Sequence, residues 1–137
     1  MSAIARKNLI AVVDDDELVR GALRRLLKTS DLGAISFGSA EDLLKSGQLP
    51  DIACLIVDIR MPGMSGLELQ AKLKAERCRI PIIFITAHGD AKMRVQAMRN
   101  GAVEFLTKPF DNAVLLETVH AAVEDYAKPL RLWDANR

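Results

Sequence analysis

Short apolar runs of strand-forming residues alternate with longer amphipathic stretches along almost the entire chain. This alternation indicates repeated β-α units, which place their strands in a parallel sheet with helices on both faces. The first, third and fourth runs are apolar throughout, as expected of central strands, whereas the second and fifth are more mixed and fit the sheet edges. The runs occupy residues 9–13, 34–37, 54–57, 82–85 and 103–106.

The stretches between the runs carry the start and stop signals of five helices. Residues 16–29 place leucines on one stripe and arginines elsewhere, which is the pattern of a surface helix. Ser65 and Glu68 form an S-x-x-E capping box, and Gly101 fits a left-handed C-terminal cap after a helix over 90–100. The other predicted N-caps are Asp16, Ser39 and Asp111. The predicted inner stripe of the last helix is Leu115, Val119, Ala122 and Tyr126.

Five such units most simply give one α/β domain, a doubly wound five-stranded parallel sheet with five helices. The length of 137 residues and the mass of 15.1 kDa suit a single domain. We expect this domain to span 1–128, followed at 129–137 by a C-terminal tail or the start of a linker.

The charge balance and the apolar runs exclude several classes of function. Nineteen basic residues against 18 acidic ones give a net charge of +1, which provides no long-range field for gathering nucleic acid or an anionic membrane. No apolar run approaches the roughly 20 residues that span a bilayer. Cys54 and Cys78 are too few for a disulfide scaffold. We therefore expect a soluble, cytoplasmic protein that binds neither a membrane nor nucleic acid directly.

Charged side chains follow three of the predicted strands at the point where each strand ends. Asp14, Asp15 and Asp16 follow the first strand, Asp58 follows the third and Lys108 follows the fifth. Each has a plain structural reading when taken alone, and Asp16 is assigned to helix capping. Because the carboxyl ends of parallel strands meet at one edge of a sheet, we expect the other groups to lie close together.

A cluster of carboxylates in one cleft needs a cation. Each pair repels by up to roughly 4 kcal/mol at 4 Å and intermediate dielectric. Oxygen ligands with incomplete protein coordination suit Mg²⁺, which keeps waters and completes its shell with phosphate oxygens. A transition-metal site would use His or Cys, but His88 and His120 lie in different predicted elements without ligand spacing.

Four motifs at these strand ends resemble the receiver domains of two-component response regulators, over about residues 9–126. They are the acidic pair in VVDDD, the D-x-x-M-P-x-x-x-G pattern of DIRMPGMSG at 58–66, Thr86-Ala87, and AMRNGAVEFLTKP at 97–109. The segment ITAHGD, which includes His88, is most similar to the FixJ-like branch, whose receivers usually precede a helix-turn-helix DNA-binding domain. The resemblance implies a flavodoxin-like (CheY-like) sheet with the strand order 2-1-3-4-5.

The resemblance also implies a phosphoacceptor signalling domain, which is not an enzyme acting on a separate substrate. Asp58 would be the nucleophile that takes a phosphoryl group. Lys108 would pair with Asp58 and then with a phosphoryl oxygen, while the Thr86 hydroxyl and backbone amides near Ala87 bind the others. The small side chain of Ala87 leaves room for a donor or for water. The Lys108–Pro109 peptide bond is expected to be cis.

The resemblance further assigns the metal ligands. Asp58 and Asp15 would bind Mg²⁺ directly, and Asp14 would act mainly through a metal-bound water. The backbone carbonyl of Arg60 would supply another oxygen. Phosphoryl transfer fits this set, because it needs a positioned carboxylate nucleophile and neutralisation of spread negative charge.

A conformational switch is expected to follow phosphorylation. The added group carries about −1.5 to −2 charges and attracts the Thr86 hydroxyl. Movement of Thr86 vacates space into which Phe105 can turn from solvent. Phe105 replaces the commoner Tyr, so its position must depend on packing, and the alternative is that Phe105 is simply a core residue.

The implied partner is a sensor histidine kinase or a histidine phosphotransfer protein that presents phosphohistidine. A basic row formed by Arg20, Arg24 and Lys28 could steer this partner, although a merely solvated helix face is the plainer reading. We also expect a phosphorylation-dependent homodimer through the helix over 90–100 and the strand over 103–106.

Three other functions fit the sequence less well. The D-x-D pattern at Asp14 to Asp16 occurs in haloacid-dehalogenase-type phosphatases, but such an enzyme would leave Asp58 without a role. A flavodoxin-like FMN site would need hydroxyls and amides where this chain has carboxylates. An interaction module that is never phosphorylated would have no physical need for a repulsive acidic pocket.

Overall fold

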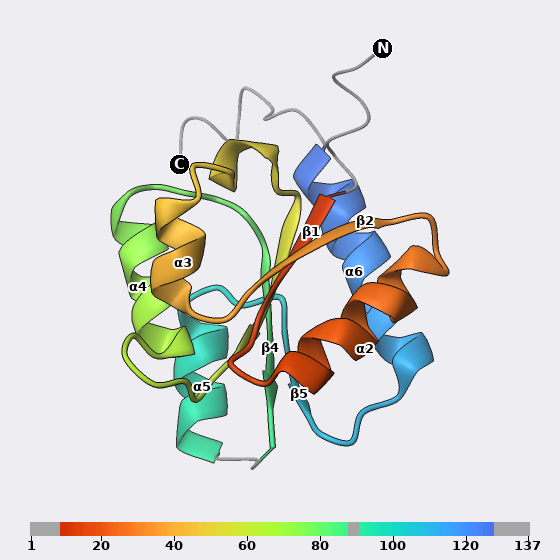
Figure 1. Ribbon diagram of the computed structural model, residues 1–137. Helices are drawn as coiled ribbons and strands as arrows, with labels where there is room; N and C mark the ends of the chain where they lie inside the picture. Colours follow the sequence, from red (N-terminus) through yellow and green to blue (C-terminus); the bar gives the residue numbers. More distant parts are fainter. Residues whose placement is uncertain (1–8, 88–90, 128–137) are drawn as a thin grey trace.

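Five parallel strands form one sheet (Figure 1): β1 (Leu9–Val13), β2 (Gly33–Phe37), β3 (Cys54–Asp58), β4 (Ile82–Thr86) and β5 (Glu104–Thr107). The computed structural model describes residues 9–87 and 91–127, so His88 and the tail lie outside the described residues. The spatial order β2-β1-β3-β4-β5 confirms the predicted order. The two mixed runs, β2 and β5, are the edge strands, as predicted.

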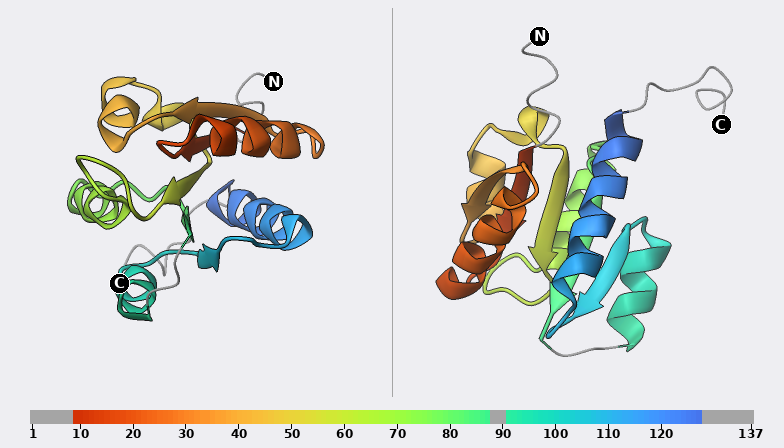
Figure 2. Two further views of the ribbon diagram at one scale, coloured as in Figure 1. Left: turned by 60° about the horizontal axis from the view of Figure 1, so that its bottom comes forward. Right: turned by 90° about the vertical axis from the view of Figure 1, so that its right-hand side faces the viewer.

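The described part of the chain contains five α-helices: α2 (Glu17–Lys28), α3 (Ala40–Lys45), α4 (Gly66–Ala75), α5 (Ala91–Arg99) and α6 (Asn112–Ala127). Helices α2 and α6 cover one face of the sheet, and α3, α4 and α5 cover the other (Figure 2). This arrangement confirms the doubly wound α/β fold. A short 3-10 helix at Leu49–Asp51 precedes β3.

Several helix ends form where the sequence predicts them. The Asp16 side chain accepts the Leu18 N–H at 2.9 Å and caps α2. Ser65 and Glu68 form both bonds of the capping box at the start of α4. Gly101 has φ +101° after α5, in the left-handed region that glycine adopts without strain. The local residues therefore determine these helix ends.

The two halves of the core lie on opposite faces of the sheet because successive strand residues point in opposite directions. On β1, Ala11 and Val13 pack in the cluster that includes the inner residues of α3, α4 and α5. Ile10 and Val12 pack in the second cluster, with leucines and valines of α2 and α6. The central strands are buried throughout their lengths, apart from the partly buried first residue of β1.

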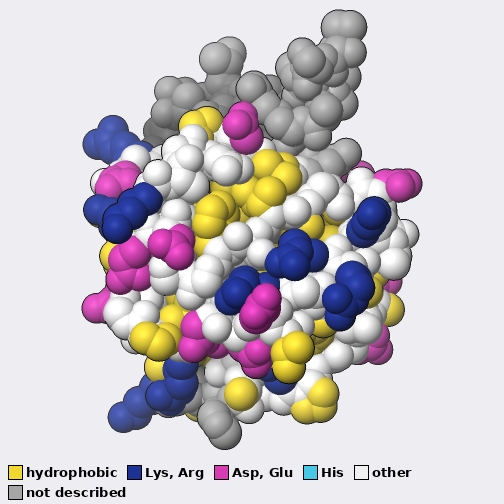
Figure 3. Space-filling view, viewed as in Figure 1, with side chains coloured by type: hydrophobic (Ala, Val, Ile, Leu, Met, Phe, Trp, Pro, Cys, Tyr) yellow, Lys and Arg dark blue, Asp and Glu magenta, His cyan; other side chains and the backbone are white. Residues whose placement is uncertain are grey.

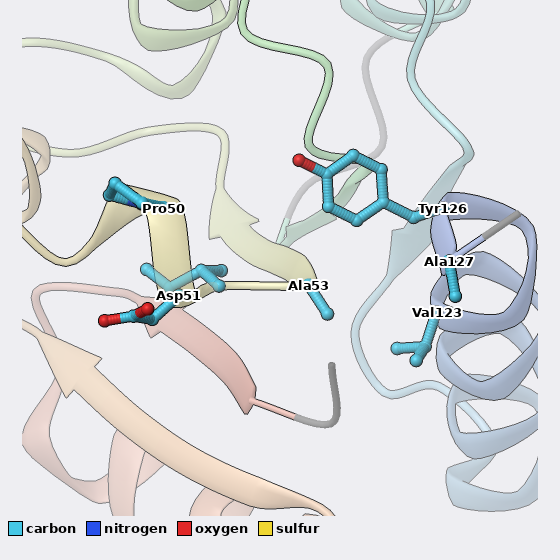
Figure 4. Close-up of a pocket in the computed structure, with 7 residues that line it drawn as sticks. Pro50, Asp51, Ala53, Val123, Tyr126 and Ala127 are labelled. Carbon is cyan, nitrogen blue, oxygen red and sulfur yellow. The ribbon is translucent and has the colours of Figure 1, made fainter. Parts of the chain in front are cut away.

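The last turn of α6 differs from the prediction. Leu115, Val119 and Ala122 are buried as predicted, but Tyr126 is 42% exposed. Its ring borders a hollow of about 160 Å³, whose other wall is formed by Pro50 and residues that precede β3 (Figure 4). The last turn of α6 thus lies beside the segment that precedes β3, and the Tyr126 ring stays partly open to solvent there.

On the face that Figure 3 shows, basic and acidic side chains are interspersed and do not gather by sign. Among the described helices, none combines the length and the apolar character needed to span a bilayer. Cys54 and Cys78 are free thiols, and burial raises the pKa of Cys54 to about 12.

Candidate functional site

Three carboxylates meet at the carboxyl end of the sheet. Asp14 and Asp15 follow β1, and Asp58 ends the adjacent strand β3. One oxygen of each residue lies within 4.8 Å of an oxygen of the other two. Asp14 is fully buried, Asp58 is 9% exposed and Asp15 is exposed. The cluster is therefore buried on its inner side and open to solvent at Asp15.

Asp14 is held by three contacts from different elements. Its Oδ1 accepts the Asp16 N–H at 2.8 Å, and its Oδ2 lies 3.4 Å from Lys108 Nζ. Its backbone carbonyl accepts a hydrogen bond from Arg20 Nη1 of α2 at 2.7 Å. These contacts fix the acidic loop and engage both oxygens of the carboxylate.

The ionised form of Asp58 is unfavourable in this environment. Burial, followed by the negative charge of Asp14, raises the pKa of Asp58 above its ordinary value. The Arg60 N–H, which donates to Asp58 Oδ1 at 3.3 Å, and the nearby charge of Lys108 act in the opposite direction. Because the raising effects dominate, a cation bound beside Asp58 would stabilise its ionised carboxylate.

Lys108 reaches the acidic cluster from the end of β5. Its ammonium makes its ion pair with Asp14 and acts on Asp58 through its charge. The expected direct pairing with Asp58 is thus replaced by pairing with Asp14 in this structure. The Lys108–Pro109 peptide bond is cis. The Lys108 N–H donates to the Thr86 carbonyl at 2.7 Å, which ties the ends of β5 and β4 together.

Thr86 and Ala87 complete the edge of the site. Thr86 is the last residue of β4 and is 1% exposed, whereas Ala87 is exposed. Residue Asp58 pairs in register with Ile85, so Thr86 follows directly beyond the phosphoacceptor candidate on the neighbouring strand. The site therefore has a hydroxyl-bearing residue on its β4 side and a small side chain at its opening.

Phe105 occupies an inward position. It is 2% exposed, and its ring lies 6.5 Å from the Phe84 ring, between centroids, at a tilt of 53°. A buried ring fits both the inward state of a switch and a plain core residue, so the movement of Phe105 stays a prediction.

The family profile of the response regulator receiver domain matches residues 10–120, which include all of these strand ends. This chain belongs to the response regulator receiver family.

Relatives of this receiver domain agree with the FixJ-like branch. Nodulation protein W of Bradyrhizobium diazoefficiens is 47% identical over 119 residues, which make up 86% of this chain and 52% of that protein. Transcriptional regulatory protein FixJ of Azorhizobium caulinodans is 41% identical over 126 residues, or 92% of this chain and 60% of FixJ. The crystal structure of FixJ-N aligns with a TM-score of 0.77 and 39% identity, covering 90% of this chain and 97% of that one. The receiver domain thus spans about half of the length of the curated relatives it matches.

The acidic cluster of the receiver domain fits a hard divalent cation. Its side-chain ligands are all carboxylate oxygens, which suit Mg²⁺ better than a transition metal. Burial, and after it the charge of Asp14, raises the pKa of Asp58 although the Lys108 ammonium lies nearby, so a bound cation would favour the ionised carboxylate. Asp14, Asp15 and Asp58 are therefore the side chains that would hold the ion.

Sequence reasoning missed several residues that position this site. Arg20 and Arg24 were expected to form a steering row or a solvated face, but Arg20 binds the Asp14 carbonyl and Arg24 donates to Ser36 Oγ on β2. Glu41 of α3 accepts the Met64 N–H at 2.9 Å and so holds the loop after Asp58. These contacts join different elements, so no spacing in the sequence signals them.

Proposed function

We propose that this receiver domain accepts a phosphoryl group on Asp58 from the phosphohistidine of a sensor histidine kinase or histidine phosphotransfer protein. The observation that carries the proposal is the cluster of three carboxylates within 4.8 Å of one another, with the Lys108 ammonium beside it. Receiver domains of response regulators work with sensor kinases, and the match covers all five strands apart from Leu9, the first residue of β1.

Asp58 is better suited than its neighbours to be the nucleophile. Asp14 is fully buried, and both of its oxygens are already engaged. Asp15 is exposed, so the protein does not surround a phosphoryl donor at that carboxylate. Asp58 keeps slight exposure and has a carboxylate destabilised by burial and by Asp14. The phosphatase alternative, which needs Asp14 as the nucleophile, is correspondingly disfavoured.

In the transfer, a carboxylate oxygen of Asp58 forms a bond to phosphorus, and the bond between phosphorus and the imidazole nitrogen breaks. The bonding electron pair leaves with that nitrogen, and because the other ring nitrogen of the phosphohistidine carries a proton, the products are an acyl phosphate and a neutral histidine. Lys108 exchanges its contact with Asp14 for a phosphoryl oxygen, and Thr86 and the amides near Ala87 bind the remaining oxygens.

Mg²⁺ bound by Asp14, Asp15 and Asp58, with the Arg60 carbonyl, would neutralise carboxylate and phosphoryl charge together. Asp14 and Asp15 keep the acidic pocket negative enough to bind such an ion. Arg20 and the Asp16 N–H hold Asp14 in place for this role.

The new charge on Asp58 changes the conformation of the surface formed by α5 and β5. Thr86 ends β4 beside Asp58, and Phe105 lies on β5 directly alongside Phe84 of β4. A shift of Thr86 toward the phosphoryl group changes the packing space of Phe105 and so the surface of α5 and β5. This surface then forms a homodimer or controls an output domain, in the manner of a cytoplasmic transcriptional regulator.

The test is phosphorylation by a small donor. Acetyl phosphate with Mg²⁺ should raise the intact mass of the chain by one phosphoryl group, and Asp58→Ala should abolish the increase. The increase should also be absent when the metal is removed by a chelator. Mass gain that survives in Asp58→Ala and is lost in Asp14→Ala would instead support the phosphatase-like chemistry.

A further inference from the structure

Arg94 of α5 makes three contacts with the segment around Phe105. Its Nη1 donates to the Phe105 carbonyl at 3.1 Å. Its guanidinium carbon lies 6.0 Å from the centroid of the Phe105 ring, within the range of a cation–π interaction. Its Nη2 lies 3.9 Å from Glu104 Oε1. One side chain of α5 thus contacts the backbone, the ring and the neighbouring carboxylate of β5.

These contacts matter because β5 is an edge strand. The backbone groups of Phe105 are bonded by side chains: Arg94 binds its carbonyl, and Glu104 Oε1 accepts its N–H at 2.9 Å. Edge strands need such cover, since exposed backbone groups would otherwise pair with water or with another chain. Arg94 and Glu104 therefore close the edge of the sheet at the residue expected to switch.

Phe105 has no hydroxyl with which to anchor itself. One side of its ring packs on Phe84 of β4, and the guanidinium of Arg94 covers it from α5. Arg94 is more than half exposed in its side chain, so its contacts must form in competition with water. A contact of this kind favours the inward position of the Phe105 ring but still allows the ring to move outward.

We propose that Arg94 is a positioning residue that holds Phe105 in its inward position and fastens α5 to β5. This inference rests on the proposed function, in which the phosphoryl group on Asp58 and the inward position of Phe105 favour each other. Because coupling between two sites is reciprocal, a side chain that stabilises the inward position also favours phosphorylated Asp58. Arg94 thereby supplies the anchor that Phe105 lacks.

The first test uses the unphosphorylated chain labelled with 4-fluorophenylalanine, because the sequence has four phenylalanines and gives four ¹⁹F signals. Phe105→Leu assigns the Phe105 signal. Arg94→Ala should move that signal toward the position of a solvent-exposed ring. The population of outward rings should rise on the order of fivefold, because this factor corresponds to the loss of one cation–π contact or one carbonyl hydrogen bond. Arg94→Lys, which keeps a cation and a donor, should lie between Arg94→Ala and the wild type.

The matched control is Arg99→Ala, which removes the same charge from an exposed position of the same helix. It should leave the Phe105 signal unchanged, and the Phe37 signal on β2 should stay constant in every variant as a check on folding. A Phe105 signal that Arg94→Ala leaves in place, or moves no further than Arg99→Ala does, would overturn the role of Arg94.

The second test measures coupling to Asp58. The initial rate of mass gain with acetyl phosphate and Mg²⁺ should fall in Arg94→Ala by the same factor as the inward population of Phe105 in the ¹⁹F spectrum, and it should stay at the wild-type value in Arg99→Ala. A released Phe105 with an unchanged rate would overturn the coupling. If the wild type itself takes up no phosphoryl group, the proposed function fails, whereas the ¹⁹F result still decides whether Arg94 holds the ring.

Discussion

The carboxylate of Asp58 is held where its own ionisation is unfavourable. Burial is the main cause, and the adjacent charge of Asp14 adds to it, so the pKa of Asp58 lies above its ordinary value. The folded chain therefore binds this proton more tightly than the unfolded chain does. The stability contribution of Asp58 is complete below the ordinary pKa of about 4 and is lost as the pH rises through the raised value.

The upward direction of this pKa shift gives a prediction for the stability of Asp58→Asn in the absence of metal. The variant should be more stable than the wild type at pH 8, by on the order of 1 kcal/mol, because it removes one charge from a repulsive cluster. The difference should shrink as the pH falls toward 4. Urea denaturation in chelator-treated buffer at several pH values measures it. A variant that is less stable than the wild type at pH 8 would contradict the account.

Addition of Mg²⁺ gives the complementary prediction. The ion should raise the thermal midpoint of the wild type, because it binds the folded acidic cluster and relieves its repulsion. Asp58→Asn should show a smaller increase, since it retains two of the three carboxylates. Calorimetry with and without Mg²⁺ measures both shifts, and the absence of any Mg²⁺-dependent shift in the wild type would count against the metal site.

Gly66 begins α4 at a position where the chain passes very close to Asp58. A Cβ at Gly66 would lie 2.6 Å from the Asp58 carbonyl oxygen and 3.1 Å from the Phe84 ring. The carbonyl belongs to the backbone of a buried strand, so it has no free space into which to move. The glycine of the D-x-x-M-P-x-x-x-G motif thus lets α4 pack against the strand that carries Asp58.

Gly66→Ala should therefore destabilise the fold by about 1–3 kcal/mol, which is typical of overpacking in a core. Gly21→Ala is the matched control, because Gly21 lies within α2 and a Cβ there would meet only the flexible end of Arg25, at 3.4 Å. It should be neutral or stabilising by up to about 1 kcal/mol. Denaturant titration of both variants checks the pair, and equal effects would contradict this explanation.

The elements that could be predicted are those with local causes. The strands follow from their apolar runs, and the helix ends follow from Asp16, Ser65 and Gly101, whose caps depend on residues a few positions away. The exposure of Tyr126 was not predicted, because it depends on where β3 begins beneath the end of α6. A helical pattern alone contains no information about the length of its neighbouring strand.

The acidic cluster could be predicted because the sheet topology itself brings strand ends together. Asp14, Asp15 and Asp58 converge by virtue of the pairing of β1 with β3. The partner of Lys108 could not be predicted in the same way, since a long side chain at a strand end can reach either Asp14 or Asp58. The roles of Arg20 and Arg94 likewise depend on contacts between elements.

At the scale of the whole molecule, the acidic cluster and a group of exposed apolar side chains lie on different parts of the domain. The carboxylates lie at the ends of β1 and β3, whereas apolar side chains are exposed on α5 and just before β5. Val95 is 55% exposed, and Met98 and Val103 are each 38% exposed. These residues could be buried when two phosphorylated chains associate through α5 and β5.

Phosphorylation should accordingly raise the molar mass in solution toward that of a dimer. Val95→Glu should keep the phosphorylated chain monomeric, because two copies would then bury like charges at the contact. Leu18→Glu is a control on a more exposed apolar residue, since Leu18 on α2 is 82% exposed and Val95 is 55% exposed. Sedimentation velocity measures the outcome, and a wild type that stays monomeric after full phosphorylation would contradict dimerisation through this surface.

The most direct test of the central claim is to locate the acquired phosphoryl group. The full chain would be treated with acetyl phosphate and Mg²⁺, reduced with borohydride to convert any acyl phosphate to an alcohol, digested and sequenced by mass spectrometry. We predict that residue 58 alone is reduced, as homoserine, and that residues 14 and 15 remain aspartate. Reduction at residue 14, or a phosphorylated chain with no reduced residue at 58, would contradict the account.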